Sequence, residues 1–445
     1  MSSKSDFINS IKKGFKNSTI TNILVVGVIT LLVKGLGFVK EIVVADSFGL
    51  TELLDTFFIA ILIPTFMSNV FLGGFSSVFI PNYVIELKKG KQIGAFQSTC
   101  FLITLVVSIV FCIIAILTTD FYLEIFFKGH TSGYYNLIKT QFYVVIPSIL
   151  FWGFSSLIHG ILTIDNEFKY SSLSAVFTPL SIMICLLFFK EELGIIVLAF
   201  GTLIGSFSGF MFLLIIALKR NIIHLKKPDF ISENIREIFR QLPAKLSANM
   251  LTGANGIIDQ YFAAQLVIGS IAALNYGVKI PMFTISIVTM ALGTVLLPYF
   301  SKKALIDRKK TFNELKKIIK IILVGSGVVA ILLVLLSTPI ISLIFEHNAF
   351  TSSDTNIVSK IQQMYLLQIP AYITTIIMVR FLESINKNGF MVLAAMICLL
   401  LNIILNFILI KKLGVYGLAL ATSIVAIINS VILYLYINHL IKLNG

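Results

Sequence analysis

Charge is scarce in this chain of 445 residues. Asp, Glu, Lys and Arg make up 13% of it, whereas hydrophobic residues make up 57%, and the mean hydropathy is +0.96. Soluble globular domains carry about 25% charged residues. The composition therefore excludes a soluble globular protein and places the chain in a lipid bilayer. No polar segment is long enough to fold as a separate domain.

Cysteine is scarce too, and nucleotide-binding motifs are absent. The four cysteines, Cys100, Cys112, Cys185 and Cys398, stand singly in apolar runs without CxxC spacing or a nearby histidine. We therefore predict packing cysteines, with no disulfide and no metal site. The sequence contains neither a P-loop nor a dinucleotide-binding fingerprint. We expect no cofactor and no ATP site, and we expect the energy to come from the membrane potential or an ion gradient.

Long apolar runs, in contrast, recur along the entire chain. A transmembrane helix needs about 20 mainly apolar residues, whereas barrel strands would alternate over pieces of about 10 residues. The first run has no small-residue cleavage site, so we interpret it as a span and not as a signal peptide. The sequence predicts an all-α polytopic membrane protein with about 12 transmembrane helices. The predicted spans are 20–46, 53–84, 94–118, 136–163, 170–189, 193–218, 243–267, 271–299, 316–345, 360–384, 390–410 and 414–438.

Basic residues outnumber acidic ones, 35 to 21, and their distribution predicts the topology. The two termini, the loops after even-numbered spans and the start of the ninth span, with Lys316, Lys317 and Lys320, hold 24 of them, whereas the opposite side holds six. Loops rich in Lys and Arg stay in the cytoplasm. Both termini are thus predicted to be cytoplasmic, in a multi-pass protein of the bacterial inner membrane. The basic loops fit contact with anionic membrane lipids and lack the patterns of nucleic-acid-binding modules, so we expect no nucleic acid.

The chain is predicted to contain two copies of a six-helix unit. The segment IPTFMSNVFLGGFSSVFIPNY, from Ile63 to Tyr83, matches IPMFTISIVTMALGTVLLPYF, from Ile280 to Phe300, at an offset of 217 residues. Two further pairs of segments, which begin with Ile-Pro and Leu-Gly, give offsets of 223 and 220. Six spans per copy make the repeats parallel, with an N-terminal lobe at 1–220 and a C-terminal lobe at 221–445. Two such lobes form a V-shaped, alternating-access bundle.

Helix-breaking residues occur at matching places in the two copies. Pro64 and Pro281 occupy corresponding positions, and Gly35 and Gly37 lie in the first span. We expect these four residues to act as hinges when the lobes rock. The alternative is that the kinks only improve helix packing.

Five basic residues lie inside predicted spans, where an ionised group is costly unless it faces water or a partner. Lys245 and Arg380 lie near cytoplasmic ends, and the other three are Lys34, Lys40 and Lys279. Lys34 lies about 20 Å into the first span at 1.5 Å per residue. Lys40 lies farther out on the same span, and Lys279 lies in the eighth span. Three cations in one chamber would bind an anion, and phosphate is the commonest anionic group on membrane-borne substrates. The alternative for Lys40 is that it extends to the outer interface.

Three carboxylates, Glu41, Asp55 and Asp259, are candidates for the same chamber. One alternative is that any of them neutralises Lys34. Asp259, in the seventh span, is either the carboxylate that couples transport to a cation or the ion-pair partner of Lys34 or Lys279. The sequence by itself does not separate these two roles.

Several motifs carry a resemblance to a known family. The segment GLGFVKEIVVADSFGLTELLDTFFIA is followed by IP and GGFSSVFIP, and later by LNYGVKIP and ALGTVLLP. This pattern resembles the MviN/MurJ lipid II flippases of the multidrug/oligosaccharidyl-lipid/polysaccharide superfamily. The motifs lie in spans 1, 2, 7 and 8, and the hydropathy and repeat pattern covers essentially the whole chain. The resemblance implies a flippase that moves an undecaprenyl-diphosphate-linked saccharide, lipid II or a related cell-surface polysaccharide precursor, to the outer leaflet. We expect it to be a monomer.

The resemblance also implies roles for individual residues. In that family, basic residues of spans 1, 2 and 8 line a cavity for the pyrophosphate of the substrate. Its arginines in spans 1 and 8 correspond to Lys34, Lys40 and Lys279, and its acidic residue before a Phe pair corresponds to Asp55. The positions of the family's arginines in span 2 hold uncharged residues in this chain. Members of the family commonly have 14 spans, whereas 12 are predicted here. Lysine keeps the charge but loses the bidentate fork of arginine. An O-antigen or exopolysaccharide lipid carrier is therefore an alternative substrate to lipid II.

Two other classes of protein are weighed against a flippase. A cation-coupled small-molecule antiporter would place carboxylates and aromatic residues in its cavity, whereas the charges inside the spans are mainly positive here. An enzyme such as a membrane glycosyltransferase would need paired acids. The longest predicted outer loops, near 118–135 and 345–359, carry scattered acids and two histidines without a nucleophile and base pattern. We therefore predict that the protein is not an enzyme.

Overall fold

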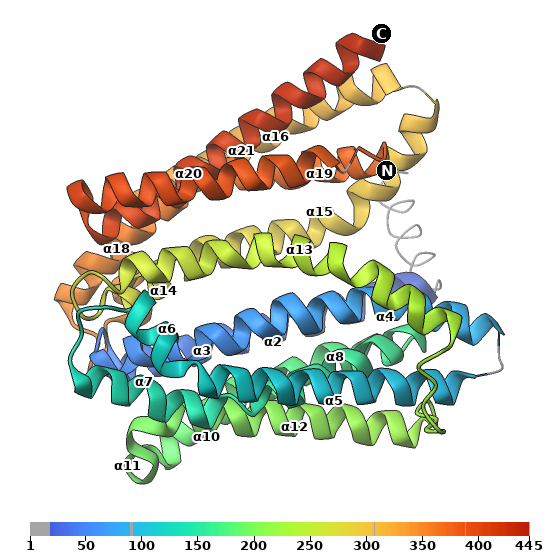
Figure 1. The fold of residues 1–445 in the computed structure, drawn as a ribbon. Helices are drawn as coiled ribbons and strands as arrows, with labels where there is room; N and C mark the ends of the chain where they lie inside the picture. Colours follow the sequence, from blue (N-terminus) through green and yellow to red (C-terminus); the bar gives the residue numbers. More distant parts are fainter. Residues whose placement is uncertain (1–17, 90–91, 307, 388, 445) are drawn as a thin grey trace, which may run out of the picture. The chain divides into compact units, whose positions relative to one another are not determined.

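The computed structural model describes residues 18–89, 92–306, 308–387 and 389–444 (Figure 1). These residues form helices joined by short turns, and no β-strand occurs among them. Ten helical stretches of this part are long and apolar enough to cross a membrane, which confirms the all-α polytopic fold. The count of twelve spans stays a prediction, because α2 (Ser18–Phe48) and α13 (Glu233–Ala263), at the first and seventh predicted spans, are not among the ten. The basic residues before Ser18 lie outside the described residues.

The chain divides into two compact units, each made of separate segments. The first unit contains the described residues up to Lys40, with Ile63–Thr118 and Lys139–Asn249, and the second contains Glu41–Leu62, Thr119–Ile138 and the residues from Met250 onward. The two helices α2 and α13 thus each contribute to both units. The predicted lobes 1–220 and 221–445 follow the sequence repeat. That these two lobes rock against each other stays a prediction.

In the first unit, helices approach closely where the sequence offers small residues. A Cβ atom added at Gly201 or Gly205 of α12 would lie 2.8 Å from the Cα of Ile182 or 2.5 Å from the Cα of Thr178 in α10. Close backbone contact at small residues is typical of transmembrane packing. The other helices wholly or partly in this unit are η1 (Ser68–Leu72), α4 (Gly73–Lys89), α5 (Ile93–Leu117), α7 (Ser132–Val145), α8 (Ser148–Ile164), α9 (Phe168–Leu173), η2 (Ser174–Val176), α10 (Phe177–Phe188), α11 (Lys190–Leu193), η3 (Gly194–Ile196) and α12 (Val197–Lys219).

The basic stretch between α12 and α13 is attached to the start of α5. Gln97 donates from Nε2 to the carbonyl of Ile222 at 2.9 Å and accepts from the amide of His224 at 2.6 Å. Two residues later, Thr99 Oγ1 accepts from the amide of Asp229 at 2.9 Å. The predicted boundary between the lobes, after residue 220, lies at the start of this stretch, and the contacts of the stretch attach it to the first unit.

In the second unit, α19 (Ile369–Ser384) is the central helix and packs on α15, α16 and α21. Ile373, Ile377 and Phe381, one helical turn apart, are almost fully buried in that packing. The other helices wholly or partly in this unit are α3 (Glu52–Met67), α6 (Thr119–Phe126), α14 (Ser270–Gly277), α15 (Lys279–Ile306), α16 (Arg308–Leu335), α17 (Ser337–Phe345), α18 (Ser352–Leu366), α20 (Gly389–Leu413) and α21 (Val415–Asn444).

Two expectations about local structure were wrong, and one predicted span is interrupted. The predicted span 271–299 overlaps Ser270–Met290, which is long and apolar enough to cross a membrane, and this stretch is broken at Val278 between α14 and α15. The predicted outer loop at 118–135 contains α6 and the start of α7. The loop predicted at 345–359 ends early, because Thr351 and Asp354 form a capping box that starts α18 at Ser352. Hydropathy locates apolar stretches but does not show breaks inside them or short polar helices between them.

Candidate functional site

An ion pair between Glu41 and Lys279 lies in the second unit. The Nζ atom of Lys279 is 2.6 Å from Oε1 of Glu41, and the two side chains are 26% and 11% exposed. Lys279 is the first residue of α15, directly after the break at Val278. Pro281 lies in the first turn of α15, where a missing backbone N–H costs no hydrogen bond. The break and the proline together place the ammonium group at a helix start, a quarter exposed and able to meet a ligand.

Asp55 of α3 holds the helix that leads to Lys279. Its Oδ2 accepts from the amide of Gly269 at 2.6 Å, and its Oδ1 accepts from the amide of Ala272 at 2.7 Å. These amides lie at the start of α14, where backbone donors lack partners within the helix. Gly269 has φ +92°, and a Cβ there would lie 2.8 Å from the carbonyl oxygen of Leu50. The buried carboxylate therefore positions α14, and its oxygens are engaged by the backbone.

Asp259 of α13 lies among neutral oxygen and nitrogen groups of α20 and α21. Its Oδ1 accepts from Nδ2 of Asn406 at 2.8 Å, and its Oδ2 accepts from Oγ1 of Thr422 at 3.3 Å. Asn406 also donates to Oδ1 of Asn402 at 3.2 Å, one turn earlier on α20. We call these four residues the Asp259 cluster. The carboxylate, the Thr422 hydroxyl and the Asn402 amide oxygen are groups that hard cations prefer as ligands, whereas Asn406 presents its Nδ2 donor to Asp259.

The sequence reasoning missed three members of the Asp259 cluster. Asn402 and Asn406 are spaced four apart in an otherwise apolar helix, and two amides on one helix face were a readable signal. Thr422 gave no such signal, because a hydroxyl group in an apolar helix commonly donates to a backbone carbonyl of its own helix. Thr422 does so to the carbonyl of Leu418.

Lys34 and Lys40 both lie on the part of α2 that belongs to the first unit. The side chain of Lys34 is exposed and that of Lys40 is half-buried. Glu41, Asp55 and Asp259, the carboxylates considered as partners of Lys34, make the contacts described above. All of those contacts lie within the second unit. The structure thus brings Lys279 together with Glu41, and a common chamber for the three lysines stays a prediction.

The four expected hinge residues lie in different local settings. Gly35 and Gly37 lie inside α2, which continues through both. Pro64 lies within α3, four residues before the π-helical turn η1, whose Asn69 carbonyl accepts from Nδ2 of Asn249 at 3.1 Å. Single π-helical turns are frequent at functional sites. The irregular backbone near Pro64 and the break before Pro281 both interrupt regular α-helical structure, and their role as hinges stays a prediction.

Known proteins resemble this chain over nearly its whole length. The family model described as lipid II flippase MurJ matches residues 44–444. A probable lipid II flippase MurJ of Buchnera aphidicola subsp. Schizaphis graminum is 28% identical over 423 aligned residues, which cover 93% of this chain and 82% of that protein. The lipid II flippase MurJ of Thermosipho africanus is 30% identical over 407 aligned residues, which cover 91% of this chain and 82% of that protein.

Solved structures show the same likeness. A lipid II flippase MurJ in an inward closed conformation aligns with a TM-score of 0.82 at 28% identity, covering 93% of this chain and 87% of that one. An inward-facing multidrug resistance MATE transporter of the MOP superfamily aligns with a TM-score of 0.76 at 14% identity, which is a likeness of fold alone. Asp55, Asp259 and Lys279 fall within the range that the family model matches, whereas Lys34 and Lys40 precede it.

Proposed function

The chain belongs to the MurJ family of lipid II flippases, and from this premise we propose that it moves lipid II from the cytoplasmic to the outer leaflet of the bacterial inner membrane by alternating access. The observation that carries the proposal is the family match over residues 44–444. As a multi-pass membrane protein of this family, the chain is a transporter and not an enzyme.

Lys279, with Lys34 and Lys40, is proposed to hold the diphosphate of the lipid carrier. The contact of 2.6 Å between Lys279 and Glu41 supports this role, because it keeps a cation charged and oriented when no substrate is bound. A diphosphate carries more negative charge than one carboxylate and can replace Glu41 as the partner of Lys279. Glu41 is thus a competing anion whose displacement accompanies substrate binding, and its side chain makes binding reversible.

The Asp259 cluster is proposed to be the site where a cation couples to transport. Asp259 has amide and hydroxyl partners on α20 and α21 in place of a lysine, which supports this role over that of an ion-pair partner. A monovalent cation bound there would neutralise the carboxylate and draw α13, α20 and α21 together. Energy from an ion gradient or the membrane potential would then act through the charge of this cluster.

The test is transport of fluorescent lipid II by the full-length protein in proteoliposomes. The variant Lys40→Gln with Lys279→Gln should lose transport by at least roughly a hundredfold, since each charged hydrogen bond to phosphate contributes about 1.5–3 kcal/mol and the variant removes two. Arginine at both positions should retain transport, because it keeps the charge and adds a bidentate fork. The matched control is Lys411→Gln with Lys412→Gln at the end of α20, which removes the same charge elsewhere.

Two results would count against parts of the proposal. Full transport by the well-inserted double variant would remove the diphosphate role of these lysines. Faster movement of an O-antigen or exopolysaccharide carrier than of lipid II would keep the proposed role of the lysines but show that lipid II is not the preferred substrate.

A further inference from the structure

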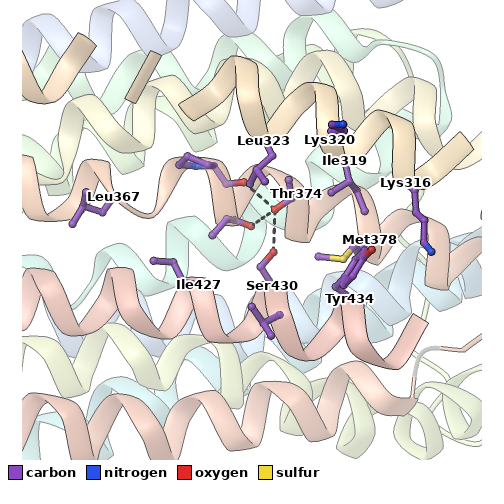
Figure 2. A pocket seen from close by; sticks show the side chains of 13 residues that line it. Lys316, Ile319, Lys320, Leu323, Leu367, Thr374, Met378, Ile427, Ser430 and Tyr434 are labelled. Carbon is purple, nitrogen blue, oxygen red and sulfur yellow. Dashed lines mark hydrogen bonds between the residues drawn. The ribbon is translucent and has the colours of Figure 1, made fainter. Parts of the chain in front are cut away.

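A second candidate binding site lies wholly within the second unit. Residues of α16, α19 and α21 line a groove with a volume of about 650 Å³, which we call the α16 groove. Figure 2 shows Lys316 at one end, near Met378 and Tyr434, and Leu367 at the opposite end. None of the residues discussed above as candidates for the diphosphate or the coupling cation lines this groove.

The floor of the α16 groove is apolar in character, even where it contains hydroxyl groups. Thr374 Oγ1 lies 2.9 Å from the carbonyl oxygens of both Pro370 and Ala371, and 3.0 Å from Oγ of Ser430 (Figure 2). These hydroxyls are satisfied by the protein itself. The remaining wall consists largely of aliphatic side chains such as Ile319 and Val431. Such a surface fits a hydrocarbon chain and offers little to a sugar or a peptide.

Positive charge is confined to one end of the α16 groove. Lys316 and Lys320 are four residues apart on α16, so they lie on one helix face, and both are exposed. The Nζ atom of Lys316 lies 4.5 Å above the ring centroid of Phe312. Among the described residues that line the groove, none is acidic. Basic pockets between transmembrane helices on the cytoplasmic side bind anionic lipid head groups, and the charge distribution predicts the cytoplasmic side for both lysines.

The dimensions of the α16 groove match one acyl chain of one leaflet. From Pro370 to Met378 the lining extends about 12 Å at 1.5 Å per residue, close to the half-thickness of a hydrocarbon core of about 30 Å. At about 30 Å³ for a group the size of a water molecule, the volume holds on the order of 20 methylene-sized groups. A fatty acyl chain has this size, whereas an undecaprenyl chain has far more carbons.

We propose that the α16 groove binds an anionic glycerophospholipid of the cytoplasmic leaflet, with its phosphate on Lys316 and Lys320 and one acyl chain along α19 and α21. This site is separate from the residues proposed to hold the lipid carrier. The bound phospholipid fills the space between α16 and α21, and its release or binding changes how firmly α16 packs on α19.

The experiment uses the purified full-length protein with equal amounts of phosphatidylglycerol and phosphatidylcholine of the same acyl chains, and native mass spectrometry counts the lipids retained. The wild type should retain phosphatidylglycerol preferentially. Lys316→Gln with Lys320→Gln should lower that preference roughly 25-fold, because each lysine near an anionic lipid contributes about a fivefold gain in affinity. The matched control is Lys302→Gln with Lys317→Gln, which removes the same charge from exposed positions outside the groove.

A second variant tests the apolar part of the site. Ile427→Trp adds bulk at a half-exposed lining position and should reduce retention of both lipids while the lysines remain. An unchanged preference in the Lys316 and Lys320 variant would overturn the proposal, as would an equal loss in the control. Displacement of phosphatidylglycerol by an equal amount of undecaprenyl phosphate would also overturn it, because the groove would then serve the carrier.

Discussion

The ammonium group of Lys279 lies 2.6 Å from a carboxylate oxygen of Glu41, although 238 positions separate the two residues in the chain. The pair joins α2 to the start of α15 within the second unit. Both side chains are largely withdrawn from solvent, so each charge depends on the other. Removing one partner takes this compensation away from the remaining charge, whereas removing both leaves a neutral contact.

The first prediction follows from this pair. Glu41→Gln and Lys279→Gln should each lower the free energy of unfolding by about 1–3 kcal/mol, and the double variant should lose less than the sum of the two. Thermal unfolding of the purified variants measures the coupling. Additive effects would show that the two charges do not stabilise each other. Transport should fall by roughly tenfold to a hundredfold in Lys279→Gln and in the double variant, whereas Glu41→Gln keeps the cation that the diphosphate needs.

The second prediction concerns the Asp259 cluster. Sodium chloride should stabilise the wild type more than choline chloride does, by about 1.4 kcal/mol when the sodium concentration is ten times Kd. Asp259→Asn should abolish this difference because it removes the charged oxygen ligand. Asp165→Asn, an exposed position after α8, is the control for the same chemical change. Equal sodium stabilisation of Asp259→Asn and the wild type would exclude the cluster as a sodium site.

The third prediction concerns Asp55 as the cap of α14. Asp55→Asn keeps one acceptor of similar geometry and loses the second, so the free energy of unfolding should fall by about 1–2 kcal/mol. Glu52→Gln, one turn earlier on α3, removes the same charge without touching α14 and should be close to neutral. A Tm that is equal for the two variants would contradict the capping role.

The fourth prediction concerns the attachment of the basic stretch to α5. Gln97→Ala removes the hydrogen bonds to Ile222 and His224, so residues 221–232 should be cleaved faster by trypsin. Gln92→Ala, which changes an exposed residue at the start of α5, is the control. Cleavage of Gln97→Ala at the wild-type rate would show that other contacts are enough to hold residues 221–232 on α5.

The fifth prediction concerns topology. Reporter fusions at Lys89 and Lys310 should be cytoplasmic, and those at Gly129 and Ser352 should be external, because basic loops are retained in the cytoplasm. A reporter at Lys310 that reads as external would contradict six spans in each half.

Much of the fold could be predicted from the sequence, because burial in lipid acts on every residue of a helix. The predicted span 94–118 corresponds to α5 at Ile93–Leu117, and 390–410 corresponds to α20 at Gly389–Leu413. The contact that holds the start of α14 could not be predicted in the same way, because Asp55 accepts there from the amides of Gly269 and Ala272, more than 200 positions away.

The sequence by itself determined that this protein crosses a membrane in helices and to which family it belongs. It also determined that Lys279, Glu41 and Asp259 need partners or water, because the cost of a charge in lipid depends on the residue and its segment alone. Only the tertiary structure decided which partner each charge has: Glu41 for Lys279, and Asn406 with Thr422 for Asp259. The physical reason is that hydrogen bonds and ion pairs act over about 3 Å. Such distances between helices far apart in the chain exist only after packing.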